Sequence, residues 1–180
     1  MNRNMNRNMN VKKMILNAIL IAIGALLHQI TPALGLPMQP DFALAMLFII
    51  IVINNDYKTT LISSIIIGIL TALTTKFPGG QLPNIIDKVV TANVIYFIFK
   101  LIGNRVNNNI KMIIALSLGT ILSGFVFLGS ASLLVGLPGS LVSLISIVVI
   151  PAAIMNIFLG MILYKAIVIA LKATGVLIRK

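Results

Sequence analysis

Ionisable side chains are scarce in this 180-residue sequence, and four of them stand beside long apolar runs, near the predicted outer ends of those runs. They are Asp41, Lys76, Asp87 and Lys88. A charge at membrane depth costs roughly 2.5 to 3.5 kcal/mol on insertion scales, so each such group needs a partner or a function. Two acids beside two bases can match both charges of a zwitterion. We therefore predict an outward-opening pocket for a small polar molecule.

Four further polar side chains belong to the same candidate site: His28, Gln81, Asn84 and Asn156. His28 lies near the end of the first apolar helix and is the last of a stripe of residues that share one helix face. It either makes one hydrogen bond between helices or lines the pocket with Asp41 or Asp87. Asn156 follows Pro151 by five residues and either bridges two helices or reaches a ligand.

The segment 76–84, KFPGGQLPN, is the longest polar interruption on the predicted outer side. Gly79 and Gly80 permit backbone angles closed to other residues, and the two prolines stiffen what surrounds them. This composition favours a shaped lid or a re-entrant loop over a cavity. Asn84 followed by Asp87 also has the spacing of a helix capping box, so the pair either caps a helix or contacts a ligand.

The sequence argues against an enzyme, a metal site and a bound cofactor. It has no cysteine, a single histidine and three acidic residues. Thiol chemistry is therefore excluded, metal ligands are too few, and no nucleophile with a neighbouring base can be named. The phosphate-binding pattern Gly-x-x-x-x-Gly-Lys-Ser/Thr is missing, so ATP would have to be hydrolysed by a partner subunit.

The composition indicates a protein embedded in a lipid bilayer. Hydrophobic residues make up 59% of the chain and charged residues 9%, with a mean hydropathy of +1.09. Soluble domains contain about 45 to 50% apolar and about 25% charged residues. We therefore predict an integral membrane protein.

Six apolar segments follow one another, each a candidate for a membrane-spanning helix of about 20 residues. They cover residues 14–30, 41–53, 59–75, 85–102, 110–136 and 141–171. The second is short, with Pro37 and Pro40 at its entry, and the sixth is long and carries Pro151. We predict an all-α bundle of six transmembrane helices over residues 14–180, after a disordered basic tail over residues 1–13. The basic start of a cleaved signal peptide is the alternative for that tail.

The distribution of Lys and Arg predicts the orientation of the bundle. Twelve of the 14 cations fall in the termini and in alternate connections, while Lys76 and Lys88 fall on the opposite side. Because cytoplasmic loops collect Lys and Arg, both termini are predicted to be cytoplasmic. The net charge of +11 then reports topology and gives no indication of nucleic-acid binding.

Small residues four positions apart form three stripes that would let helices approach closely. The stripes are Ala18 with Ala22, Ser64 with Gly68 and Ala72, and Ala115 with Gly119 and Ser123. Tight packing inside the bundle explains each of them, and the first is also a candidate docking face for a partner. Aromatic side chains that could stack on a ligand are few: Phe42, Phe77, Tyr96 and Phe125.

A six-helix protein of this length, with an Ala-x-x-x-Ala face on its first helix, resembles the substrate-binding S-components of energy-coupling-factor transporters. There the face docks on a membrane-embedded coupling subunit, and here Ala18 and Ala22 would provide it. Longer stretches resemble the TrpP family of bacterial tryptophan transport proteins over nearly the whole chain from Met14 onward. These stretches cover residues 24–41, 73–88 (LTTKFPGGQLPNIIDK, the strongest), 119–124, 135–139 and 151–156.

The resemblance implies a multi-pass protein of the bacterial cell membrane that binds and imports L-tryptophan or a close indole relative. The family has a Lys before its Pro-Asp pair, where this chain has Gln39, so Lys76 or Lys88 becomes the candidate for holding the substrate carboxylate. The implied partners are the lipid bilayer and an energy-coupling module of a transmembrane subunit with ATPases. A proton or sodium gradient is the other energy source left open.

Two other functions remain open on the sequence alone. The first is an S-component that binds a vitamin such as thiamine, riboflavin or biotin, with the same architecture but a different pocket. The second is a membrane scaffold that transports nothing.

Overall fold

The structure is a computed structural model that describes residues 2–31 and 40–174. Within these residues every regular element is helical, which confirms the predicted all-α fold. The predicted outer loop 31–40, including Pro37 and Gln39, lies almost entirely outside the described residues.

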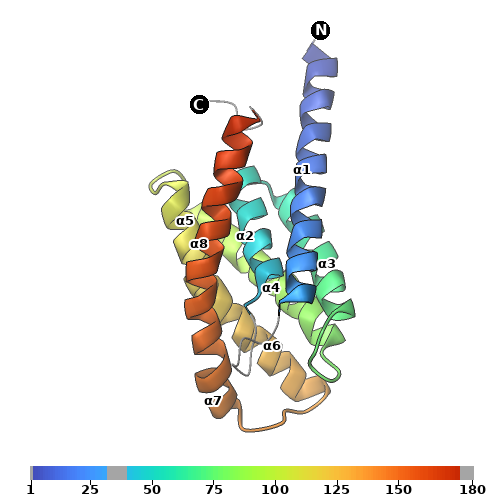
Figure 1. The fold of residues 1–180 in the computed structure, drawn as a ribbon, viewed down its shortest axis with the longest axis vertical. Coiled ribbons are helices and arrows are strands. Elements are labelled where there is room, and N and C mark those ends of the chain that lie inside the picture. The colour runs from blue at the N-terminus through green and yellow to red at the C-terminus, as the bar shows by residue number, and fades with distance from the viewer. Residues whose placement is uncertain (1, 32–39, 175–180) are drawn as a thin grey trace.

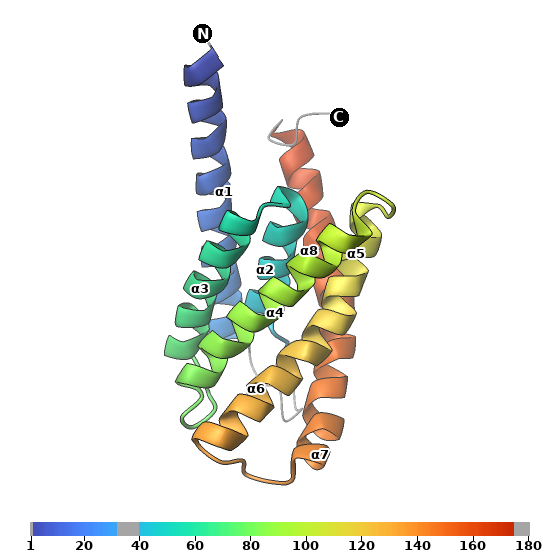
Figure 2. The same cartoon turned by 180° about the vertical axis from the view of Figure 1, so that it is seen from behind.

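The described residues form six helical segments, drawn in Figures 1 and 2. The first four are α1 (Asn2–Ile30), α2 (Phe42–Asn54), α3 (Tyr57–Leu73) and α4 (Gln81–Ile102). The fifth runs without a break through α5 (Asn108–Ile114), η1 (Ala115–Gly119) and α6 (Thr120–Leu134). The sixth joins α7 (Leu141–Leu144), η2 (Ile145–Val149) and α8 (Ile150–Ala173).

The start of α1 and the end of α8 lie at the same end of the bundle (Figure 1). Three segments are long and apolar enough to cross a membrane within the described part of the chain, namely Val11–Ile30, Asn108–Leu134 and Leu141–Ala173. Helices α2 and α3 are shorter apolar helices, and α4 carries Asp87, Lys88 and Lys100. That all six segments cross, with both termini in the cytoplasm, remains a prediction.

Helix α1 begins at Asn2, so the structure has a helix where the sequence predicts a disordered tail over residues 1–13. No glycine or proline interrupts this stretch, and Met, Arg and Lys are good helix formers. The basic segment therefore continues the helix of the apolar residues that follow it. The division of the chain into a tail and a transmembrane domain at residue 14 remains a prediction.

Helix α2 lies at the centre of the bundle, and its ten residues from Ala43 to Val52 are all buried. It contacts α1, α3, α4, α5, η1 and α8. A helix that is apolar all round is enclosed by protein or by lipid, and here the surrounding helices enclose it. Its 13 residues span about 20 Å at 1.5 Å per residue, less than the roughly 30 Å of a hydrocarbon core. The end of α2 at Asp41 can therefore lie below the membrane surface.

Two of the three small-residue stripes are packed inside the bundle. A Cβ placed on Gly68 would come within 3.1 Å of the Ile85 Cα of α4, and one on Gly119 within 2.5 Å of the Phe48 ring of α2. These contacts confirm close helix approach at both stripes. The remaining stripe differs, because Ala18 and Ala22 are exposed on the outer face of α1.

The fifth and sixth segments each contain one wide π-helical turn, η1 and η2. Pro151 explains η2, because a proline ring clashes with the carbonyl four residues earlier, here that of Ile147. Turn η1 ends directly before Thr120, and η2 ends about two helical turns before Asn156; both of these polar residues are buried in the bundle. Turns of this kind are frequent at functional sites.

Candidate functional site

A pocket of about 280 Å³ opens among α1, α2, α4, α6 and α8 and under the segment that joins α3 to α4. Its lining includes seven of the eight predicted substrate-binding residues. They are His28, Asp41, Lys76, Asn84, Asp87, Lys88 and Asn156. The eighth, Gln81, is exposed at the start of α4 and does not belong to the lining.

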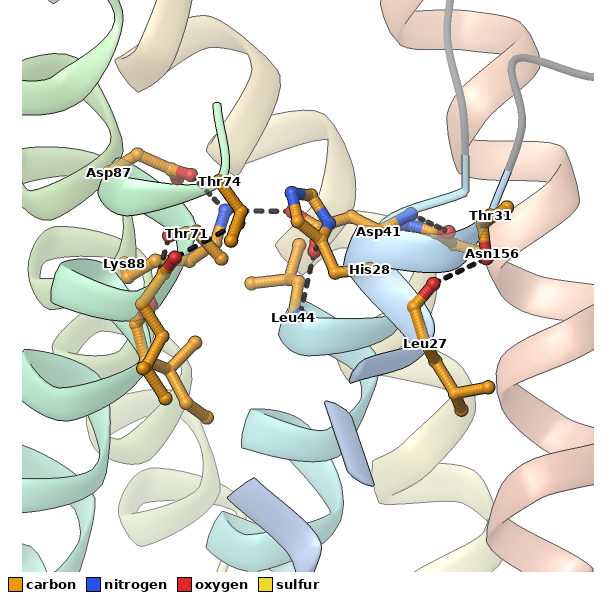
Figure 3. Close-up of polar contacts among 12 residues, drawn as sticks. Leu27, His28, Thr31, Asp41, Leu44, Thr71, Thr74, Asp87, Lys88 and Asn156 are labelled. Atoms are coloured by element: carbon orange, nitrogen blue, oxygen red, sulfur yellow. Dashed lines mark hydrogen bonds and ion pairs between the residues drawn. The ribbon is translucent and has the colours of Figure 1, made fainter. Parts of the chain in front are cut away.

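Lys88 joins the two acids of the pocket (Figure 3). Its Nζ lies 2.7 Å from Asp41 Oδ2 and 2.5 Å from Asp87 Oδ2. The side chains of Lys88 and Asp87 are 3% and 1% exposed, and that of Asp41 is 22% exposed, so Asp41 is the more accessible of the two acids that line the pocket. This cluster carries one more negative than positive charge when all three groups are ionised.

Each acid is held by the helix that carries it. Asp41 is the N-cap of α2, and its Oδ1 accepts from the Leu44 amide at 2.9 Å. Asp87 lies in the second turn of α4, where its Oδ1 accepts from Thr91 Oγ1 one turn later at 3.0 Å. Hydrogen bonds to charged groups are the stronger ones, and they gain further strength where water is excluded.

Three further polar residues surround the Asp41 end of the cluster. His28, on the last turn of α1, places its Nδ1 3.6 Å from Asp41 Oδ1. Asn156 of α8 accepts from the Asp41 amide through its Oδ1 at 2.9 Å, and its Nδ2 donates to Thr120 Oγ1 of α6 at 3.3 Å. The Lys76 Nζ donates to the Thr31 carbonyl at 3.1 Å and so ties the α3–α4 segment to the end of α1.

The capping-box interpretation of Asn84 and Asp87 is wrong. Helix α4 begins at Gln81, four residues earlier than predicted, with Gly80 as its N-cap. Pro83 explains the early start, because a proline fits the first turn of a helix, where its missing N–H would have no partner. Asn84 Nδ2 donates to the Gly80 carbonyl at 2.8 Å, and the Asp87 carboxylate binds Lys88 and Thr91 instead of a helix end.

One wall of the pocket is aromatic. Phe77, from the α3–α4 segment, meets Phe127 of α6 edge to face, with ring centroids 5.4 Å apart and planes at 86°. Of the other aromatic candidates, Tyr96 packs against Tyr57 and Phe97, and Phe125 is 47% exposed.

The sequence reasoning missed an entire face of α6 that lines the pocket. Thr120, Ser123, Gly124 and Phe127 all contribute to the lining. Their spacing of three, four and seven residues is that of a single helix face, which is a signal that the sequence contains. Thr75, just before the predicted lid, was missed as well.

Comparison with known proteins identifies the family. The model of the family described as "Tryptophan transporter TrpP" matches residues 10–172. This chain belongs to the TrpP family. The match confirms the resemblance seen in the sequence and includes most or all of each of the six helical segments.

Three curated relatives of this TrpP family member carry the name "Probable tryptophan transport protein". The one from Clostridium perfringens is 48% identical over 175 residues, covering 92% of this chain and 96% of the relative. The one from Clostridium acetobutylicum is 49% identical, with 87% and 91% covered, and the one from Bacillus subtilis is 42% identical, with 85% and 88% covered. No solved structure matches this chain.

Family membership confirms two further predictions. TrpP proteins are named as transporters and not as enzymes, and together with the long apolar helices this makes the chain a multi-pass protein of the cell membrane. In the described residues, no three His, Cys, Asp or Glu side chains gather where they could hold a metal ion.

Proposed function

We propose that this TrpP family member binds L-tryptophan, or a close indole relative, in the pocket around Asp41, Asp87 and Lys88 and carries it inward across the membrane. The observation that carries this proposal is the buried cluster of two acids with one base beside an aromatic wall. An aromatic amino acid bound there would place its ammonium group at the surplus negative charge and its ring against the aromatic wall.

The ammonium of the substrate would bind at Asp41, the more exposed acid of the cluster. Its carboxylate would meet Lys76, an exposed lining residue whose Nζ also donates to the Thr31 carbonyl. Charge-assisted hydrogen bonds of this kind are short and strong. The two ends of the zwitterion thus match two different parts of the lining.

The indole would rest against Phe77 and Phe127, because aromatic rings prefer edge-to-face or offset contacts. Asn84 would accept from the indole N–H, since its Oδ1 makes no hydrogen bond among the described residues. The volume of about 280 Å³ lies near the lower end of the roughly 300 to 1,000 Å³ of small-molecule pockets. It therefore favours a single amino acid over a larger ligand such as riboflavin.

The pocket is proposed to open toward the outside of the cell, as the cation distribution predicts. Two energy sources are candidates for driving the substrate inward across the membrane. The exposed Ala18 and Ala22 of α1 suit docking on an energy-coupling module, while His28, Asp41 or Asp87 could couple uptake to a proton or sodium gradient.

Equilibrium binding of labelled L-tryptophan to the purified protein tests this function. We expect saturable binding that unlabelled tryptophan displaces and that thiamine, riboflavin and biotin do not. Asp41→Asn should weaken binding, whereas Asp56→Asn, on the exposed turn before α3, should leave it unchanged. Displacement by a vitamin would favour the S-component alternative, and unchanged tryptophan uptake with Asp41→Asn and Asp87→Asn would favour the scaffold.

A further inference from the structure

Asn156 is the buried amide that connects the sixth helical segment to the pocket, and it is 2% exposed. Both ends of its side chain are engaged. Its Oδ1 accepts from the backbone amide of Asp41 at 2.9 Å, and its Nδ2 donates to Thr120 Oγ1 at 3.3 Å. Figure 3 shows Asn156 reaching Asp41 from the side opposite to Lys88.

The backbone N–H of Asp41 needs an acceptor from elsewhere, because helix α2 provides none. As the N-cap, Asp41 comes before the first helical residue, and its own N–H points out of the hydrogen-bonding pattern of the helix. Asn156 supplies the missing acceptor. The carboxylate of the same residue is held by Leu44 and Lys88, so Asn156 completes the set of contacts that place it.

The two hydrogen bonds that Asn156 makes affect which residue can accept the indole N–H. Its Nδ2 is committed to Thr120, which sets the rotation of the amide, and its Oδ1 already accepts one hydrogen bond. An indole N–H would have to share that oxygen in a side chain that is almost fully enclosed. In the described part of the chain, the Oδ1 of Asn84 accepts no hydrogen bond.

We infer that Asn156 is a positioning residue for substrate binding: it holds Asp41 where its carboxylate meets the substrate ammonium, and it does not receive the indole N–H. This inference rests on the proposed function. The wide turn η2, imposed by Pro151, ends about two helical turns before Asn156 on the same helical segment.

Three ligands separate the possible roles of Asn156. L-Tryptophan has both an ammonium and an indole N–H, 3-benzothienyl-L-alanine has the ammonium and a sulfur in place of the N–H, and indole-3-propionate has the N–H without the ammonium. Binding constants are measured for the purified protein and for Asn156→Ala. We expect Asn156→Ala to weaken tryptophan and benzothienylalanine by the same factor, about five- to tenfold for one lost hydrogen bond. Indole-3-propionate should be unaffected.

A double-mutant cycle tests whether the effect passes through Asp41. Asp41→Asn keeps the backbone amide and removes the charge that meets the ammonium. We expect Asn156→Ala to add less than twofold to the loss caused by Asp41→Asn, because the group that it positions no longer attracts the substrate. Asn93→Ala is the matched control, since Asn93 Nδ2 donates within its own helix to the Val89 carbonyl at 2.7 Å.

Three results would overturn the inference. A loss for tryptophan and indole-3-propionate but not for 3-benzothienyl-L-alanine would make Asn156 the acceptor of the indole N–H. An equal loss for all three ligands would make its role structural, and full additivity with Asp41→Asn would show that Asn156 acts independently of Asp41. If Asn156→Ala does not fold, Asn156→Ser keeps a polar group that is too short to reach the Asp41 amide, and the same pattern is expected. Absence of tryptophan binding by the unmodified protein would instead overturn the proposed function.

Discussion

Lys88 pairs with two carboxylates in a place that water hardly reaches, so the charge balance of the pocket depends on it. Its Nζ contacts both Asp41 and Asp87 within 2.7 Å. Removing one partner from a buried ion pair leaves charge without compensation, which costs about 3 to 5 kcal/mol. The cluster proposed to bind the substrate ammonium therefore also contributes to the stability of the fold.

The first prediction concerns the contribution of Lys88 to stability. Lys88→Met should lower the free energy of unfolding by about 3 to 5 kcal/mol, seen as a lower melting temperature in detergent. Lys100→Met, at the exposed end of the same helix, is the matched control and should change little. Adding Asp87→Asn to Lys88→Met should recover part of the loss. An unchanged melting temperature would contradict the described ion pairs.

The second prediction concerns the aromatic wall. Phe127→Ala should weaken tryptophan binding about tenfold, because it removes the ring that meets Phe77 and the wall against which the indole would rest. Phe125→Ala changes a ring two residues away that is 47% exposed outside the pocket, so binding should stay as it was. Equal effects of the two changes would argue against indole stacking at this wall.

Among the elements, α2 and the fifth helical segment show how the core positions the site. Gly119 ends η1 and lies against the Phe48 ring of α2, and Thr120 follows it directly into the pocket. Any side chain at residue 119 would force the Phe48 ring or the two helices to shift, because protein interiors are close-packed. The position of the pocket wall on α6 thus depends on a glycine that itself touches no ligand.

The third prediction compares two glycines of this segment. Gly119→Ala should destabilise the protein by about 1 to 3 kcal/mol, because its Cβ would stand 2.5 Å from Phe48. Gly129→Ala meets no atom within 4 Å and replaces glycine inside a helix, so it should be neutral or should stabilise by up to about 1 kcal/mol. Thermal unfolding of both variants in the same detergent measures the difference, and equal melting temperatures would contradict the packing.

At the scale of the whole molecule, two features bear on transport: the exposed outer face of α1 and the filled interior below the pocket. Ala18 and Ala22 are exposed, although small residues at this spacing usually mark helix contacts. The interior below the pocket is filled by the buried core of α2, including Phe48, and by Leu116 of η1, both at 0% exposure. Inward movement therefore needs a change of conformation or of orientation, and a partner on α1 is one way to drive it.

The fourth prediction tests that partner. Ala22→Leu should abolish tryptophan uptake in cells while leaving tryptophan binding by the purified protein unchanged, because the change is on the outer face and away from the pocket. Ile23→Leu, at an exposed neighbouring position of α1, is the control and should transport normally. Full uptake by Ala22→Leu in cells that lack an energy-coupling module would rule out docking and favour a proton or sodium gradient.

Hydrophobicity and local spacing were sufficient to predict much of this protein from its sequence. The apolar composition predicted a helical membrane protein. The rare charges beside apolar segments predicted four residues of the pocket, because buried charge is too costly to occur without a reason, and polar side chains in the same segments predicted three more. Motifs such as TTKFPGGQLPNIIDK identified the family. These signals are local and can be seen in an extended chain.

Contacts between distant segments were decided by the tertiary structure alone. Spacing could not show that Lys88 pairs with Asp41, 47 residues away, or that Asn156 bonds the Asp41 amide across 115 residues. The α6 face with Phe127 became part of the pocket because the bundle turns it inward, and Gln81 was left out because α4 starts before Pro83. Such pairings depend on how helices rotate and pack against one another, and no single helix specifies that rotation.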